Sequence, residues 1–110
     1  MTDQPIKPEG NLFAGLPEAP KEEWFETLAR NTHVHIERIV SHGHASPPDF
    51  WYDQDHAEWV VLLQGRAVLA YSDGRRKELA PGDFVLIGPN EKHRVEETDP
   101  CTLWLAVHFG

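Results

Sequence analysis

One carboxylate and one imidazole, at the ends of two short apolar runs, are the side chains of this sequence best suited to chemistry. Glu58 opens the run EWVVLLQG, and His93 closes the run PGDFVLIGPNEKH. Carboxylate oxygens and neutral imidazole nitrogens are ligands of divalent metal ions in proteins. Whether they form one site depends on the elements that position them.

Those elements are predicted to be β-strands. From residue 33 onward, apolar runs of strand length are separated by turn residues; the runs are VHIERIV, EWVVLL, RAVLAY, RKELA, FVLI, HRVEE and TLWLAVHF. Turns such as Ser72-Asp73-Gly74 and Pro81-Gly82-Asp83 lie between them. Seven or eight short strands without intervening helices predict an all-β sandwich, jelly roll or small barrel.

The N-terminal part predicts an arm followed by a short helix. Residues 1–10 contain two prolines, one glycine and mixed charges, a composition typical of a flexible arm. Residues 11–110 are then a single domain, as expected for a chain of this length. Between Pro17 and Arg30, a proline and two acidic residues precede the apolar stripe Trp24, Phe25 and Leu28, which predicts a helix.

Composition excludes several classes of partner. The chain has 110 residues with 18 acidic and 10 basic ones, so its formal net charge is −8. The basic cluster Arg75-Arg76-Lys77 borders a turn and is too small for a nucleic-acid surface. The apolar run Trp59–Leu63 is too short to span a membrane, and the first residues lack a signal-peptide pattern, so we expect a cytoplasmic protein. Cys101 is the one cysteine and has no disulfide partner within the chain.

The segment from Glu58 to His93 resembles the two motifs of the cupin family. Glu58, six residues and Gly65 match the first motif, and Pro81-Gly82-Asp83, nine residues and His93 match the second. The resemblance covers roughly residues 34–109. It implies an antiparallel jelly-roll barrel with the Glu58 and His93 side chains in one interior cavity.

The same resemblance implies a candidate metal site at Tyr52, Gln54, Glu58 and His93, for Fe, Mn, Ni, Cu or Zn. Cupins usually open their first motif with His-x-His, where this chain has Tyr52-Asp53-Gln54. A phenol ligates well only as a phenolate, and an amide oxygen is a weak donor. This set should therefore hold such an ion less tightly than three imidazoles would, and a metal-free pocket is the alternative.

Two His-x-His strings lie outside this motif. His33 and His35 share one strand face with Glu37, opposite Val34 and Ile36, which is typical of an exposed polar face. His42 and His44 lie at a strand end beside a loop that leads to the site. We expect either that one of them replaces the missing imidazole or that both are half-buried strand-end residues.

Two further residues, Trp51 and Arg38, complete the candidates. Trp51 belongs to the aromatic triplet Phe50-Trp51-Tyr52 and is either a pocket wall or part of a core or subunit contact. Arg38 shares the parity of Val34 and Ile36, so an interior position would require a carboxylate partner, either Glu58 or the carboxylate of a bound ligand. His56 is predicted to be exposed.

The run Trp59–Leu63 is apolar on both faces, which predicts a cover on both faces. A second subunit is the favoured cover and gives a homodimer; the N-terminal helix is the alternative. Two functions remain for the cavity. One is a metal-dependent enzyme acting on a small polar organic molecule, and the other is a non-catalytic cupin that binds or senses a small molecule without a metal.

Overall fold

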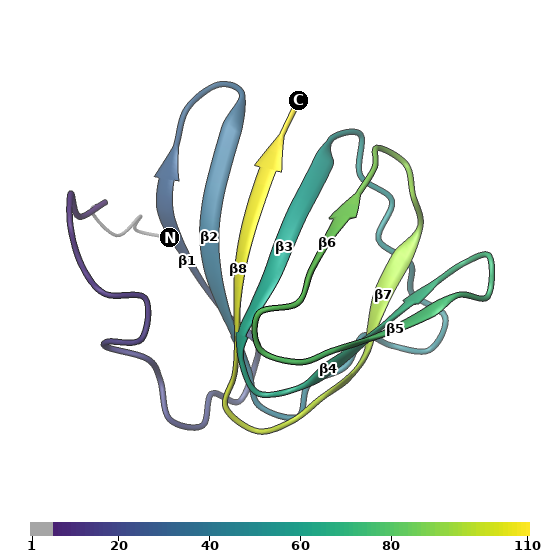
Figure 1. Ribbon diagram of the computed structural model, residues 1–110, viewed down its shortest axis with the longest axis horizontal. Helices are drawn as coiled ribbons and strands as arrows, with labels where there is room; N and C mark the ends of the chain where they lie inside the picture. Colours follow the sequence, from purple (N-terminus) through teal and green to yellow (C-terminus); the bar gives the residue numbers. More distant parts are fainter. Residues whose placement is uncertain (1–5) are drawn as a thin grey trace.

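The computed structural model describes residues 6–110 and consists of two antiparallel β-sheets that face each other (Figure 1). The strands are β1 (Trp24–Arg30), β2 (Val34–Ser41), β3 (Ala57–Gln64), β4 (Ala67–Tyr71), β5 (Arg76–Leu79), β6 (Phe84–Ile87), β7 (His93–Thr98) and β8 (Thr102–Phe109). The larger sheet has the order β1-β2-β8-β3-β6, and the smaller sheet has the order β5-β4-β7. The predicted all-β jelly roll is confirmed.

The core lies between the two sheets and follows from the alternation of side chains along the strands. On β3, Val60 and Leu62 are 4% and 0% exposed, and Trp104 and Ala106 of β8 are equally buried. The cluster is made of eight buried residues, namely Val60, Leu62, Ala67, Leu69, Leu79, Ile87, Trp104 and Ala106. The inward face of β3 therefore also carries Glu58, two residues before Val60.

The predicted N-terminal helix is wrong, because residues 24–30 form strand β1 at the edge of the larger sheet. β1 pairs antiparallel with β2, with Trp24 opposite Val40 and Arg30 opposite His35. The apolar residues Trp24, Phe25 and Leu28, whose spacing predicted a helix, also fit an irregular strand, because the register shifts between Thr27 and Ala29. Without β1, the outer backbone groups of β2 would lack hydrogen-bond partners.

Residues 6–10 of the predicted arm are exposed, and residues 1–5 lie outside the described part of the chain. The segment that follows runs along the β1 side of the larger sheet, while β6 forms the opposite edge (Figure 1). Within residues 6–110, no helix has the length and hydrophobicity required to cross a bilayer.

Candidate functional site

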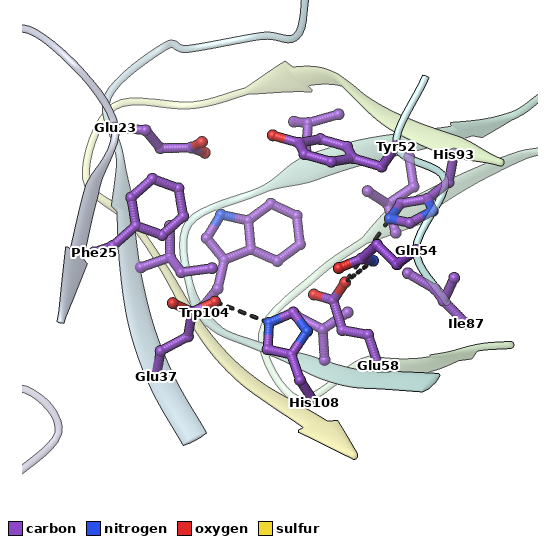
Figure 2. Close-up of a pocket in the computed structure, with 14 residues that line it drawn as sticks. Glu23, Phe25, Glu37, Tyr52, Gln54, Glu58, Ile87, His93, Trp104 and His108 are labelled. Carbon is purple, nitrogen blue, oxygen red and sulfur yellow. Dashed lines mark hydrogen bonds and ion pairs between the residues drawn. The ribbon is translucent and has the colours of Figure 1, made fainter. Parts of the chain in front are cut away.

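A cavity of about 210 Å³ lies between the two sheets (Figure 2). Its wall combines carboxylates, imidazoles and aromatic rings with aliphatic core residues. The lining residues are Glu23, Phe25, Glu37, Ile39, Tyr52, Gln54, Glu58, Val60, Leu69, Ile87, His93, Val95, Trp104 and His108. The structure thus brings all four predicted metal ligands to one cavity.

Glu58 and His93 face each other across this cavity. Glu58 lies near the start of β3 and His93 is the first residue of β7, so the pair connects the two sheets. Glu58 Oε1 lies 3.8 Å from His93 Nε2, and the two side chains are only 12% and 6% exposed. A distance of 3.8 Å is too long for a direct hydrogen bond, which leaves room for a third group to bridge the pair.

The backbone fixes which nitrogen of His93 faces the cavity. His93 Nδ1 lies 2.9 Å from the carbonyl oxygen of Glu91. A carbonyl only accepts hydrogen bonds, so Nδ1 carries the proton and donates it. In the neutral ring, Nε2 is then an acceptor with a free lone pair, and residues 6–110 form no hydrogen bond to it.

Gln54 and Tyr52 approach the pair differently. Gln54 Nε2 donates to Glu58 Oε1 over 3.0 Å, so the amide supports the carboxylate rather than pointing an oxygen at a shared centre. The Tyr52 ring stacks on His93 at 5.5 Å, and its hydroxyl extends toward Glu23, away from the pair (Figure 2). Burial, followed by the charges of Glu23, Glu58 and Glu37, raises the pKa of Tyr52 and keeps it a neutral phenol.

Comparison with known proteins identifies the family of this chain. The model of the cupin domain matches residues 34–108. The chain belongs to the cupin family. A protein from Ralstonia eutropha JMP134, provisionally named as a mannose-6-phosphate isomerase, is 40% identical to this cupin; the match covers 92% of this chain and 96% of that protein, with a TM-score of 0.89.

More distant structures share the fold. A cupin superfamily protein from Desulfitobacterium hafniense DCB-2 is 18% identical with a TM-score of 0.77, and the match covers 99% of this chain and 98% of that protein. An RmlC-like cupin from Desulfovibrio desulfuricans is 12% identical with a TM-score of 0.72, over 91% of this chain and 94% of its own. No curated protein matches the chain.

Cupins often bind a metal, but the donors present in this cupin do not form the predicted four-residue set. The Gln54 amide nitrogen is turned to Glu58, and the neutral phenol of Tyr52 points elsewhere. Two side chains, Glu58 and His93, are left to share an ion, which is fewer than the three or more protein ligands of typical sites. Across residues 6–110, no group of three or more His, Cys, Asp or Glu side chains is arranged to hold one ion.

The cavity also contains an ion pair between His108 and Glu37, which was not predicted from the sequence. His108 Nε2 lies 2.9 Å from Glu37 Oε2, and His108 Nδ1 lies 3.1 Å from His56 Nε2. His56 in turn contacts Asp55 at 3.2 Å, so it is a half-buried member of a hydrogen-bonded chain rather than the exposed residue predicted. The hydrogen bond to Glu37 is the main cause that raises the pKa of His108.

The polar face of β2 was predicted to be exposed, and this prediction is wrong for Glu37 and His35. Glu37 lines the cavity, and His35 Nε2 lies 2.9 Å from Thr27 Oγ1. The inward faces of β2, β3 and β8 all change from apolar to polar toward the same end, where Glu37, Glu58 and His108 lie. This shared change in polarity is the signal in the sequence that could have identified the inner faces.

The remaining candidates do not line the cavity. Arg38 lies on the outer face of β2, where it binds Glu26 and the carbonyl oxygens of residues 11, 12 and 14. His42 and His44 follow β2 at the end opposite His35 and bind each other and the Lys21 carbonyl. The ring of Trp51 lies under the guanidinium of Arg94, 4.5 Å away.

The pair of His108 and Glu37 predicts a pH-dependent stability. Because the pKa of His108 is raised in the folded state, its contribution is present below the unfolded value of about 6.5 and is lost as the pH rises through the higher folded value. We expect Glu37→Gln to lower the free energy of unfolding by about 1–3 kcal/mol at acidic pH and by less at alkaline pH. Urea denaturation at several pH values measures this.

The control for this experiment is His33→Gln, which changes an exposed histidine outside the cavity. Three other titratable groups face His108, namely His56, Glu58 and His35, and they are present in both variants. A destabilisation by Glu37→Gln that is equal at acidic and alkaline pH would contradict the assignment of a charged pair.

Proposed function

We propose that this cupin binds a small polar organic molecule directly on the side chains of its cavity, without a resident metal ion. The observation that supports this most strongly is the Nε2 atom of His93. It belongs to a side chain that is 6% exposed, it faces the cavity, and it lacks a hydrogen-bond partner within the described residues. No side-chain nitrogen or oxygen of residues 6–110 is both fully shielded from solvent and without a partner, so Nε2 is open to the cavity, where a ligand can donate a hydrogen bond to it.

Glu58 and Gln54 give the same ligand a second anchor. The Glu58 carboxylate is oriented by Gln54 and lies 3.8 Å from His93 Nε2. A ligand with two hydrogen-bond donors, O–H or N–H, would bridge both acceptors. A few oriented polar groups within a largely apolar wall are typical of small-molecule pockets.

The charge of the wall disfavours anionic ligands. Glu23, Glu37 and Glu58 line the cavity, and no lysine or arginine does. Phosphate groups are usually bound by arginine, lysine or backbone N–H groups, and neither arginine nor lysine lines this cavity. A phosphorylated sugar, the substrate class in the provisional name of the Ralstonia relative, therefore has no evident phosphate site in this cavity.

A thermal-shift screen combined with metal analysis tests this proposal. The ligand set contains polyols, free sugars, amines, phosphates and carboxylates, and the protein is first treated with a chelator. We expect neutral or cationic compounds to raise the melting temperature of the wild type and of the control His33→Ala, but not of His93→Ala. We also expect far less than one metal ion per chain before chelation.

Stoichiometric metal that is lost in His93→Ala would overturn the metal-free proposal. Histidines that bind metals commonly donate their other ring nitrogen to a carbonyl, as His93 does, so this outcome has a definite structural basis. The function would then be the metal-dependent one.

We also propose that this cupin is a homodimer joined through the outer face of the larger sheet. An outer apolar patch extends over β3, β6 and β8 and consists of Trp59, Val61, Phe84, Leu86, Leu105 and Val107. Phe84 and Leu86 are both 61% exposed. The predicted N-terminal helix, the alternative cover of this patch, is strand β1 instead, and β1 and the segment before it lie at the opposite edge of the sheet (Figure 1).

Light scattering of a micromolar solution is expected to give about twice the chain mass of 12.5 kDa. Leu86→Glu should halve that mass, because it places a charge within the apolar contact. Lys77→Glu, at an exposed position on the smaller sheet, is the control and should leave the dimer intact. A monomeric wild type would contradict the proposal.

A further inference from the structure

Hydrogen-bond acceptors outnumber free donors on the wall of the cavity. The acceptors are the carboxylates of Glu23, Glu37 and Glu58, each of which accepts one hydrogen bond within the protein and can accept more, and the Nε2 atom of His93. His93 is a second feature that points to a ligand, because its side chain is 6% exposed and its cavity-facing Nε2 has no hydrogen-bond partner in residues 6–110. A ligand that forms hydrogen bonds with this wall must therefore supply hydrogen-bond donors.

Most donors of the wall are already used within the protein. Gln54 donates to Glu58 over 3.0 Å, and the indole Nε1 of Trp104 donates to Ser41 Oγ over 3.1 Å. Both ring nitrogens of His108 are engaged, one with Glu37 and the other with His56. The hydroxyl of Tyr52 remains as a donor, so the cavity offers a ligand few groups that could pair with a carboxylate, a phosphate or a carbonyl oxygen.

The three carboxylates approach the cavity from different elements. Glu37 comes from β2, Glu58 from β3, and Glu23 from the residue directly before β1 (Figure 2). Their combined charge acts on Tyr52, whose pKa is raised by burial and then by these same three residues. Even with His108 protonated, negative charge is in excess on the wall, because no lysine or arginine lines it.

Aromatic rings supply a second feature that favours cations. Phe25, Tyr52 and Trp104 line the cavity; in Figure 2, Phe25 and Trp104 lie between Glu23 and Glu37, and Tyr52 lies beside His93. The face of an aromatic ring is electron-rich and attracts a cation within about 6 Å. Rings combined with carboxylates can accommodate both the charge and the carbon skeleton of an organic cation.

From these observations we infer that the ligand of this cavity is a small organic ammonium ion, a protonated primary or secondary amine, whose N–H groups bridge Glu58 and His93 Nε2. The inference rests on the proposed direct binding of small molecules and names their chemical class. The ammonium group donates to His93 Nε2, which lacks a partner, and to the Glu58 carboxylate beside it, and its carbon skeleton contacts the rings of Phe25 and Trp104. A neutral hydroxyl can supply one such donor but not the charge.

Calorimetric titration with three compounds of the same shape tests this inference. Benzylammonium, benzyl alcohol and benzoate carry the same ring on a positive, neutral and negative group. We expect benzylammonium to bind about tenfold or more tightly than benzyl alcohol, and benzoate not to bind detectably. Glu58→Gln keeps the size of the side chain and should lower the affinity for benzylammonium about tenfold, with little effect on benzyl alcohol.

Two further variants make the result specific. Glu23→Gln should also weaken benzylammonium, whereas Glu22→Gln, an exposed carboxylate outside the cavity, should not. Thermal melts of every variant show whether it is folded, and either Glu58→Gln or Glu23→Gln alone is sufficient for the test.

Equal affinity for benzylammonium and benzyl alcohol, with binding that is lost in His93→Ala, would overturn the cation inference and leave the proposed small-molecule function intact. Tighter binding of benzoate, or failure of all three compounds to bind, would also overturn it. The broader proposal falls only if no compound of the thermal-shift screen depends on His93.

Discussion

Replacing Gly65 with alanine is expected to lower the free energy of unfolding by about 3 kcal/mol or more, through a steric clash and backbone strain together. A Cβ at this position would lie 2.4 Å from Thr102 Oγ1 and 2.8 Å from Thr102 Cα. Thr102 is fully buried, and its hydroxyl donates to the Asp99 carbonyl over 2.7 Å, so it has little freedom to move. The backbone φ of +87° adds strain for any other residue.

Gly74→Ala is the matched control for this prediction. Its φ of +98° is similar, but a Cβ there would have no heavy atom within 4 Å. The control should therefore cost only about 1 kcal/mol, which is the contribution of backbone strain. Urea denaturation measures both variants, and equal losses would show that contact with Thr102 does not matter.

Arg38→Met is the second variant with a large expected effect, a loss of about 3–5 kcal/mol in the free energy of unfolding. The guanidinium is held by Glu26 at 2.5 Å and by the carbonyl oxygens of Leu12 and Ala14 at 2.9 and 2.8 Å. It also lies 5.4 Å from the centre of the Trp24 ring. Methionine fills similar space but leaves the Glu26 carboxylate without its cation and releases the N-terminal segment.

Arg66→Met is the control, because Arg66 is 41% exposed in a surface pair with Glu78 and should contribute less than about 1 kcal/mol. Chemical denaturation and ligand titration are measured on both variants. Since Arg38 lies on the outer face of the sheet, the folded fraction of Arg38→Met should bind cavity ligands as the wild type does. Lost binding with unchanged stability would instead place Arg38 in the site.

The strands could be predicted from the sequence because their information is local, and the resemblance to the cupin motifs selected the jelly roll. Alternation along EWVVLL fixes which β3 residues share a face, and Val60 and Leu62 are indeed core residues beneath Glu58. The two motif fragments carry glycines whose conformation the fold requires, and Gly65 and Gly82 both have positive φ. These features also placed Glu58 and His93 in one cavity.

The wrong predictions concern features that depend on contacts with residues distant in the sequence. Residues 24–30 became a strand because β2 offered an open edge, which a helical stripe in one segment does not reveal. The alternation of side chains predicts two faces for β2 but not which one faces the other sheet. The pairing of β2 with β8 places Glu37, rather than Arg38, on the face that lines the cavity. A buried arginine required a partner, as expected, yet the partner was Glu26 and the N-terminal backbone rather than Glu58.

The state of His93 is the most direct test of how this cavity binds its ligand. Long-range ¹H–¹⁵N NMR of histidine-labelled protein at about pH 8, where free imidazole is neutral, reports which ring nitrogen carries the proton. His93→Gln assigns the signal among the seven histidines of the chain. We expect a protonated Nδ1, bound to the Glu91 carbonyl, and a bare Nε2 whose signal moves when a ligand is added. A protonated Nε2 and a bare Nδ1 would contradict the account, because the cavity would then present a donor where a ligand is predicted to donate.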